Sequence, residues 1–313
     1  MASLLYNILR EVRPRQWIKN FALFAALVFS GFFFVPGYFS RVLIAFILFC
    51  LLSSAVYIIN DIVDAPMDRA HPFKRKRPIA SGAIPVSLAW QIAIILLILV
   101  ALGSLALSTF FFSMGVAYVL LHIAYTYWLK HVAVLDVLTI AAGFIIRIYA
   151  GAVVVSLHMS VWFLLTVISA SLFLAVGKRQ SERTLLQGRG ENLKEHRDTL
   201  AHYTQRLLDI YTGMFANATW VTYALYTFQR DEFVPQGKAV RIFALLPKTF
   251  TAQKWLMITV PIVIYGVMRY LQLVYEQNEG ESPERVLLRD KPLLISAGSF
   301  ALLVMILIYG GLG

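Results

Sequence analysis

Nine long apolar stretches, separated by short polar or charged segments, make up most of the chain. They lie at about residues 18–35, 41–59, 86–107, 109–129, 134–155, 160–177, 206–228, 254–275 and 292–311. Each is close to the roughly 20 residues that a helix needs to cross the hydrocarbon core of a bilayer. None shows the alternation of apolar and polar residues that barrel strands require. The pattern predicts an all-α polytopic membrane protein with about nine transmembrane helices.

A shorter apolar pattern precedes the first stretch. Its apolar residues recur at helical spacing: Leu4, Leu5, Ile8 and Val12. This spacing favours a short interfacial helix over about residues 2–13, ending near Pro14. Together with the nine stretches, it predicts that residues 1–313 form a single transmembrane domain.

The composition agrees with a membrane protein. The 313 residues are 59% hydrophobic and 14% charged, with a mean hydropathy of +0.71, whereas soluble domains carry about 25% charged residues. These values exclude a disordered chain and an ordinary soluble enzyme. The single cysteine, Cys50, allows neither a disulfide within the chain nor a cysteine metal site. The net charge of +11 points to membrane topology and anionic ligands, and no nucleic-acid partner is expected.

The distribution of lysine and arginine predicts the orientation. The N-terminal segment and the loops on its side of the membrane hold 20 of the 28 Lys and Arg residues, and the opposite loops hold 6. The positive-inside rule puts the first set in the cytoplasm; its loops are 60–85, 130–133, 178–206 and 276–291. Fifteen of the 17 acidic residues lie on that side or in spans nearby. We expect a multi-pass protein of the inner (cytoplasmic) membrane whose chemistry faces the cytoplasm.

The second apolar stretch ends in a cluster of acidic residues. Asn60, Asp61, Asp64 and Asp68 fall on one face of a helix, although Pro66 is expected to kink or interrupt that helix before Asp68. Carboxylates at the negative end of a helix dipole repel one another, and a divalent cation removes this cost. Oxygen ligands suit Mg²⁺. The predicted metal ligands are therefore Asp61, Asp64 and Asp68.

A run of cations follows the acidic cluster directly. It consists of Lys74, Arg75, Lys76 and Arg77. Arginine binds phosphate through two parallel hydrogen bonds and lysine binds it as a point charge, so Lys74, Arg75 and Arg77 are candidate phosphate ligands. The alternative is that the run only fixes the topology.

The acidic cluster and the Arg77-Pro78-Ile79-Ala80-Ser81-Gly82 segment after it resemble the first signature of the UbiA superfamily of intramembrane prenyltransferases. Further motifs resemble its decaprenyl-phosphate phosphoribosyltransferase branch. They lie at residues 13–20, 71–75, 177–182 and 284–293. The resemblance runs from about residue 10 to residue 311 and implies a UbiA-like helical bundle.

The loop after the sixth stretch departs from the superfamily pattern. Members with aromatic acceptors carry a second pair of aspartates there, whereas this chain has Lys178, Arg179 and Glu182. Two cations in place of two carboxylates favour direct binding of a second phosphate, with Glu182 orienting Arg179 or a ribose hydroxyl. The later charges of this loop are expected to be solvated: Glu191, Lys194, Glu195 and Arg197.

Arg147 lies about 11 residues into the fifth apolar stretch. An arginine inside the membrane is costly, so it is expected to face the interior with an anionic partner. That partner is either Asp136, about 16 Å away along a helix, or a substrate phosphate. Lys130, at the end of the fourth stretch, and Lys19, in the first motif, are further candidate phosphate ligands.

The resemblance implies a reaction. The ribosyl 5-phosphate of 5-phosphoribosyl 1-diphosphate would pass to a polyprenyl (decaprenyl-type) phosphate, with release of diphosphate, as a step in making cell-wall glycolipid precursors. Asp61, Asp64 and Arg147 would be the catalytic residues, Mg²⁺ the cofactor, and Asn60 and Asp68 would orient metal-bound water. Two alternatives stay open, namely a UbiA-type prenyltransferase that uses a prenyl diphosphate and a polar acceptor, and a transporter. A homo-oligomer is compatible with the sequence.

Overall fold

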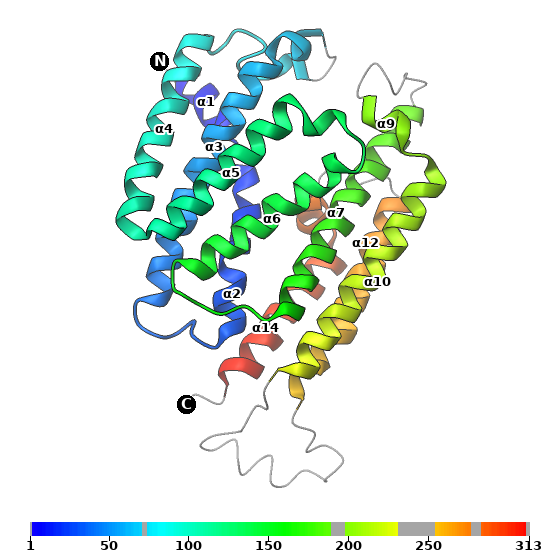
Figure 1. Ribbon diagram of the computed structural model, residues 1–313. Helices are drawn as coiled ribbons and strands as arrows, with labels where there is room; N and C mark the ends of the chain where they lie inside the picture. Colours follow the sequence, from blue (N-terminus) through cyan, green and yellow to red (C-terminus); the bar gives the residue numbers. More distant parts are fainter. Residues whose placement is uncertain (1, 71–73, 189–197, 231–253, 277–282, 311–313) are drawn as a thin grey trace, which may run out of the picture. The chain divides into compact units, whose positions relative to one another are not determined.

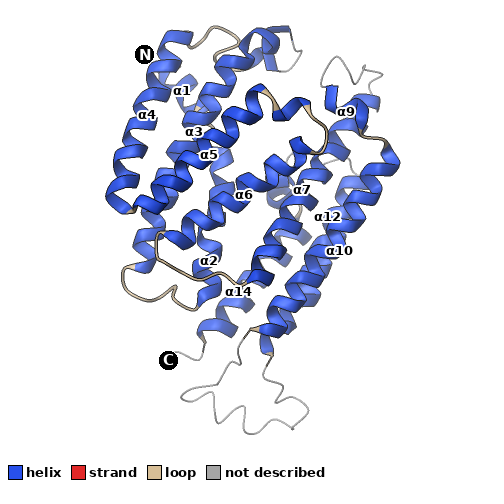
Figure 2. Cartoon of the chain, in the orientation of Figure 1, coloured by secondary structure: helices blue, strands red, loops and turns tan. Residues whose placement is uncertain are grey.

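The computed structural model describes residues 2–70, 74–188, 198–230, 254–276 and 283–310. Every regular element in these ranges is a helix (Figure 2), which confirms the predicted all-α class. The chain forms two compact units, Met1–His158 and Met159–Gly313. That the whole chain acts as one catalytic domain stays a prediction.

The first unit contains the blue-to-green helices of Figure 1. In chain order they are α1 (Ala2–Glu11), η1 (Pro14–Ala22), α2 (Leu23–Ser30), α3 (Tyr38–Ala70), η2 (Lys74–Lys76), α4 (Val86–Leu107), α5 (Thr109–Tyr127), η3 (Leu129–His131) and α6 (Leu135–Val153). The long helix α3 packs against α2, α4, α5 and η1. Its central side chains, such as Phe49 and Leu52, meet Phe111 and Tyr118 of α5 in the core.

The second unit is built on the pairing of α7 (Val161–Gly188) with α10 (Gln205–Gln229). Its other helices are α9 (Asp198–His202), η5 (Trp255–Thr259), α12 (Val260–Glu276), α13 (Pro283–Arg289) and α14 (Lys291–Tyr309). Side-chain caps begin two of the helices, since Thr204 accepts from the first turn of α10 and Asp290 from that of α14. Phe173 of α7 packs on Tyr270 of α12 in the core of this unit.

Seven of the helices in the described residues are long and apolar enough to cross a membrane. They match the apolar stretches that begin near residues 41, 86, 109, 134, 160, 254 and 292. The stretch 206–228 forms α10, which carries many hydroxyl and amide side chains. The stretch 18–35 contains the end of η1 and the short helix α2. Gly31 ends α2 with a left-handed φ of 88°.

Two local expectations can be checked at proline residues. The N-terminal helix α1 ends at Glu11, three residues before Pro14, as predicted. The expectation that Pro66 would interrupt the next helix is wrong, because α3 continues to Ala70. Proline inside a helix removes one backbone hydrogen bond and crowds the carbonyl of the preceding turn, and the packing of α3 on α4 and η2 offsets that cost. Asp68 therefore lies on the same helix as Asp61.

Close packing of α6 on the chain at the start of α2 depends on a glycine. A Cβ atom on Gly151 would overlap the backbone carbonyl of Leu23, and backbone gives way less easily than a side chain. Gly151→Ala should therefore lower the free energy of unfolding by at least about 1–3 kcal/mol. The measurement is thermal unfolding of the purified protein, with Gly115→Ala as control, since a Cβ there meets only Leu52 at an ordinary 3.6 Å. Equal stability of the two variants would contradict this packing.

Candidate active site

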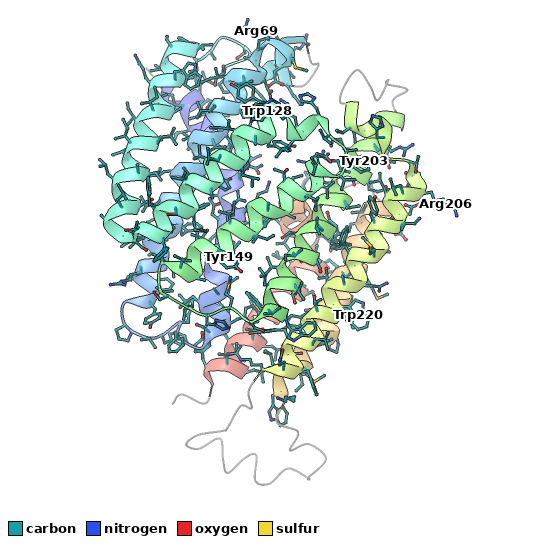
Figure 3. All side chains as sticks on the ribbon, viewed as in Figure 1. Arg69, Trp128, Tyr149, Tyr203, Arg206 and Trp220 are labelled. Atoms are coloured by element: carbon teal, nitrogen blue, oxygen red, sulfur yellow. The ribbon has the colours of Figure 1, made fainter. Side chains whose placement is uncertain are left out.

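The C-terminal end of α3 gathers the acidic residues that the sequence singled out. Asp61 accepts hydrogen bonds from Arg13, which precedes η1, and from Arg77, at 3.0 Å. Arg77 also donates to Asp68 at 2.5 Å. Both carboxylates are almost completely buried. The ends of α3 and α5, marked by Arg69 and Trp128 in Figure 3, lie toward the same side of this unit.

Asp64 is held by a second set of contacts. Its carboxylate accepts from the Lys130 ammonium of η3 at 2.9 Å and from the Asn60 amide at 2.9 Å. The amide oxygen of Asn60 accepts in turn from Thr126 of α5 at 2.9 Å. The structure therefore brings Asn60, Asp61, Asp64, Asp68, Arg77 and Lys130 together, and their role as site residues stays a prediction.

Arg13 belongs to this cluster although sequence reasoning did not select it. Its backbone has a left-handed φ of 55°, a conformation that costs a non-glycine residue of order 1–3 kcal/mol and is concentrated at functional sites. Its guanidinium lies 5.2 Å from the centre of the Tyr57 ring. Burial lowers the pKa of Arg13, but the adjacent Asp61 carboxylate outweighs that effect and raises it. The signal available in the sequence was its place in the motif before Pro14.

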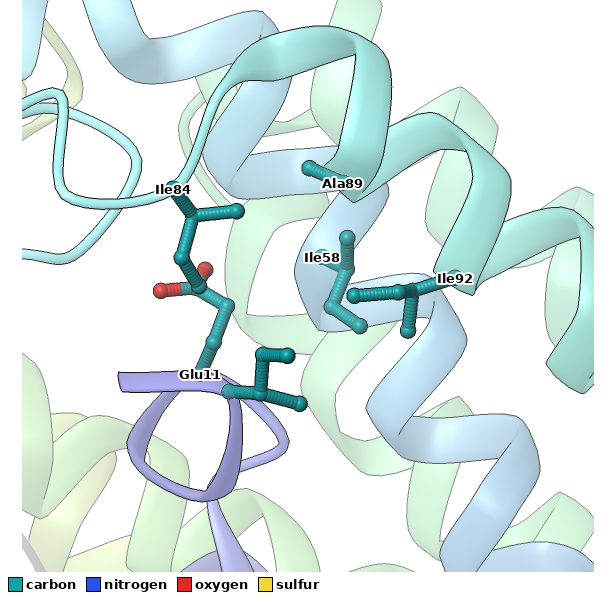
Figure 4. A pocket seen from close by; sticks show the side chains of 6 residues that line it. Glu11, Ile58, Ile84, Ala89 and Ile92 are labelled. Atoms are coloured by element: carbon teal, nitrogen blue, oxygen red, sulfur yellow. The ribbon is translucent and has the colours of Figure 1, made fainter. Parts of the chain in front are cut away.

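Glu11 is a second acid that the sequence did not flag. Figure 4 shows it at the end of α1 among Ile58, Ile84 and Ile92, and only 3% of it is exposed. Burial raises the pKa of the Glu11 carboxyl to about 8, and a hydrogen bond with Asp61 contributes in the same direction. The N-terminal helix is thereby joined to the acidic cluster of α3.

Arg147 of α6 lies in the interior of the first unit, as expected from its position in the membrane. Its guanidinium donates to three neutral oxygens, those of Asn20 (2.8 Å), Tyr118 (2.6 Å) and the Gly143 backbone (2.9 Å). An ion pair with Asp136, one of the two partners considered, is not among these bonds, because the two residues are too far apart along one helix. Arg147 is thus oriented by neutral groups.

The remaining candidates of the first unit lie near the same end of α3 or in the N-terminal segment. Lys74 and Arg75 are exposed residues of η2, and Lys19 is a half-buried residue of η1. The motif residues 71–73 lie outside the described residues.

The cations of the second loop belong to the second unit. Lys178 and Arg179 lie on α7, where Lys178 is half-buried and Arg179 is fully buried and ion-paired with Glu182. This contact is one of the two roles expected for Glu182. The charges expected to be solvated, Glu191 to Arg197, lie outside the described residues.

The donor set of the first unit fits a magnesium ion. In the described part of the chain, no three His, Cys, Asp or Glu side chains are grouped closely enough to hold a metal. Mg²⁺, however, is usually bound by one or two carboxylates together with substrate phosphates and water. Asp61 and Asp64 supply carboxylates of this kind, each now neutralised by a cation.

Apolar spanning helices and a cluster of carboxylates and cations at the end of one of them describe a multi-pass membrane protein with a charged site. The family model described as the UbiA prenyltransferase family matches residues 20–289. The chain belongs to this family, which confirms the resemblance noted in its motifs and sets aside the transporter alternative.

Curated relatives cover nearly the whole chain. The decaprenyl-phosphate phosphoribosyltransferase of Mycolicibacterium smegmatis is 35% identical over 94% of this chain and 89% of its own length. That of Corynebacterium glutamicum is 33% identical over 97% of this chain and 87% of its own length. Among solved structures, a UbiA homologue from Archaeoglobus fulgidus bound to GPP and Mg²⁺ is similar with a TM-score of 0.68, at 18% identity, over 96% of this chain and 99% of its own.

Proposed function

We propose that this protein transfers the 5-phosphoribosyl group of 5-phosphoribosyl 1-diphosphate to a decaprenyl-type polyprenyl phosphate and releases diphosphate. The observation that carries the proposal is the identity of 33–35%, over nearly the full chain, with relatives named for this activity. We assign the step to the synthesis of cell-wall glycolipid precursors. The presence of Lys178 and Arg179 in place of a second acidic motif supports two phosphorylated substrates.

Asp61 and Asp64 would hold Mg²⁺, and Asp68, which is paired with Arg77, would orient metal-bound water. When bound, the ion neutralises the charge that develops on the departing diphosphate. Each carboxylate is already paired with a cation from another element, either Arg77 or Lys130. With Asp61 and Asp64 holding the ion, Arg77 and Lys130 would contact the phosphate oxygens of the donor, together with Lys74 and Arg75 from η2.

The transfer itself breaks the bond between C1 of ribose and the diphosphate and forms a bond from C1 to an acceptor phosphate oxygen. The acceptor is already an anion, so the step needs no strong general base. Bringing two anions together needs positive charge. In the first unit, Arg147 and Lys19 would provide it. Lys178 and Arg179, in the second unit, are separate candidates for binding a phosphate. The transition state at C1 would have oxocarbenium character, as in other glycosyl transfers.

One assay tests the proposal directly. Purified protein is incubated with labelled 5-phosphoribosyl 1-diphosphate, decaprenyl phosphate and Mg²⁺, and the label is followed into the lipid phase. We expect a lipid-soluble ribosyl phosphate and an equal amount of diphosphate. If none forms, while geranyl diphosphate is consumed with an aromatic acceptor, the protein is a prenyltransferase. That second function is favoured by the fold shared with the homologue bound to GPP.

Lys178→Ala should raise the apparent KM of one phosphorylated substrate without changing the Mg²⁺ dependence. A charge-assisted hydrogen bond contributes about 1.5–3 kcal/mol, which corresponds to roughly 10–150-fold in apparent affinity. Apparent KM values for donor, acceptor and Mg²⁺ decide the matter. The control is Lys291→Ala, at an exposed position of α14. An unchanged KM for both substrates would leave Lys178 with a topological role.

The proposed orientation puts the site on the cytoplasmic side of the inner membrane. A cysteine at the exposed residue 76 (Lys76→Cys) should resist a membrane-impermeant maleimide in intact cells. A cysteine at the exposed residue 40 (Ser40→Cys), in the first turn of α3 at the opposite end of that helix, should be labelled. Both should react once the cells are permeabilised. Labelling at residue 76 from outside would reverse the orientation.

A further inference from the structure

Thr126 links two helices at the candidate site. It lies in the last turn of α5, and its hydroxyl oxygen is 2.9 Å from the amide oxygen of Asn60 on α3. The same hydroxyl is 2.9 Å from the backbone carbonyl of His122, one turn earlier. A threonine hydroxyl has one proton, so it can be donated to only one of these two oxygens at a time.

The hydrogen bond between Asn60 and Asp64 fixes which end of the Asn60 amide faces Thr126. Asp64 is paired with the Lys130 ammonium at 2.9 Å, and an ionised carboxylate only accepts hydrogen bonds. The Asn60 group that faces Asp64 at 2.9 Å must therefore be its NH₂. The amide oxygen of Asn60 consequently faces Thr126, and the Thr126 hydroxyl is the donor in the contact between them.

We propose that Thr126 is a positioning residue, which fixes the Asn60 amide so that its NH₂ group orients the Asp64 carboxylate. The proposal rests on the proposed function in one respect, the role of Asp64 as a metal ligand. The groups around a metal ligand set its orientation, and their loss typically costs 10–100-fold in metal affinity or activity.

Removal of the Thr126 hydroxyl leaves the Asn60 oxygen without this donor. Thr126 is only 7% exposed, so a valine in its place leaves the Asn60 oxygen against a methyl group. Turning the amide over would set its oxygen against the Asp64 carboxylate, which is repulsive. The Asn60 side chain would then leave its present position, and Asp64 would lose one of its two hydrogen bonds.

The test compares three variants of the full-length protein in detergent. Thr126→Val removes the hydroxyl, Thr126→Ser retains it, and Thr139→Val is the matched control. Thr139 is also 7% exposed, and its hydroxyl donates to the Leu135 carbonyl of its own helix, at 2.6 Å. The readout is the affinity for Mn²⁺ in the presence of inorganic diphosphate, followed by the electron paramagnetic resonance of free Mn²⁺. Turnover against Mg²⁺ concentration is measured in parallel, and thermal unfolding reports on folding.

We expect Thr126→Val to weaken Mn²⁺ binding by about 10–100-fold, and Thr126→Ser and Thr139→Val to stay within about twofold of wild type. If Thr126→Val fails to fold, Thr126→Ala removes the same hydroxyl without adding bulk and takes its place. In an Asn60→Ala background, loss of the hydroxyl should have no further effect, because Thr126 acts on Asp64 through the Asn60 side chain.

Wild-type affinity in Thr126→Val, or equal weakening in Thr126→Ser, would overturn the proposal. So would an additive loss in the Asn60→Ala background. A wild-type protein that binds Mn²⁺ but makes no ribosyl phosphate would overturn the proposed function and leave the Thr126 proposal supported if the variants keep their order. Absence of Mn²⁺ binding by the wild type would overturn both.

Discussion

Asp61→Asn and Asp64→Asn should each reduce turnover by on the order of 10³-fold, because each removes a carboxylate from the proposed metal site. The two carboxylates are held differently. Asp61 is only 2% exposed and is bonded to two arginines, whereas Asp64 is half-buried and bonded to Lys130 and Asn60. We therefore expect Asp61→Asn to lower the thermal stability as well, and Asp64→Asn to act mainly on turnover.

The measurement is initial rate against Mg²⁺ concentration, together with thermal unfolding. Asp290→Asn is the matched control, because Asp290 is also paired with an arginine, Arg269 at 2.6 Å, but caps α14 in the second unit. Its effect should be confined to stability. Near-wild-type turnover of either site variant at limiting Mg²⁺ would remove that residue from the proposed ligand set.

Arg147→Met should lower kcat/KM by at least about 100-fold, mainly through a higher KM for a phosphorylated substrate. The guanidinium is buried, and its three hydrogen bonds go to uncharged groups. A buried charge without an anionic partner is costly, and a substrate phosphate would supply the missing partner. Arg147→Lys retains the charge but cannot span three acceptors, so it should recover only part of the activity.

Tyr118→Phe provides the control for Arg147. It removes one of the three acceptors and leaves the positive charge in place, so its effect should stay within about tenfold. Apparent KM values for donor and acceptor separate the two roles of the arginine. If Arg147→Met is less stable but keeps both KM values, the arginine serves the packing of the first unit alone.

The acidic face of α3 could be predicted from the sequence because helical spacing alone puts Asn60, Asp61 and Asp64 together. The spanning helices could be predicted from the length of the apolar stretches. The interruption expected at Pro66 does not occur, because the packing of α3 against its neighbours keeps the helix continuous.

The partners of the acidic residues could not be predicted, because they come from distant parts of the chain. Arg13 reaches Asp61 across 48 positions, and Thr126 reaches Asn60 across 66. Glu11 lies in the predicted interfacial helix, and nothing in its sequence context distinguishes it from a solvated charge. Only the tertiary fold shows it among isoleucines. Sequence reasoning did not identify the neutral partners of Arg147 for a related reason, since charge patterns indicate ion pairs but not hydrogen bonds to amide and phenol oxygens.

The length of α3 has a consequence for how the two substrates meet. Its 33 residues span about 50 Å at 1.5 Å per residue, against about 30 Å for the hydrocarbon layer. With α3 close to the bilayer normal, Asn60 lies about 33 Å from the start of the helix, at the depth of the lipid headgroups. A polyprenyl phosphate would then reach the carboxylates by lateral diffusion within its leaflet, with its isoprenoid chain still in the hydrocarbon core. The sugar diphosphate would arrive from water without entering the hydrocarbon.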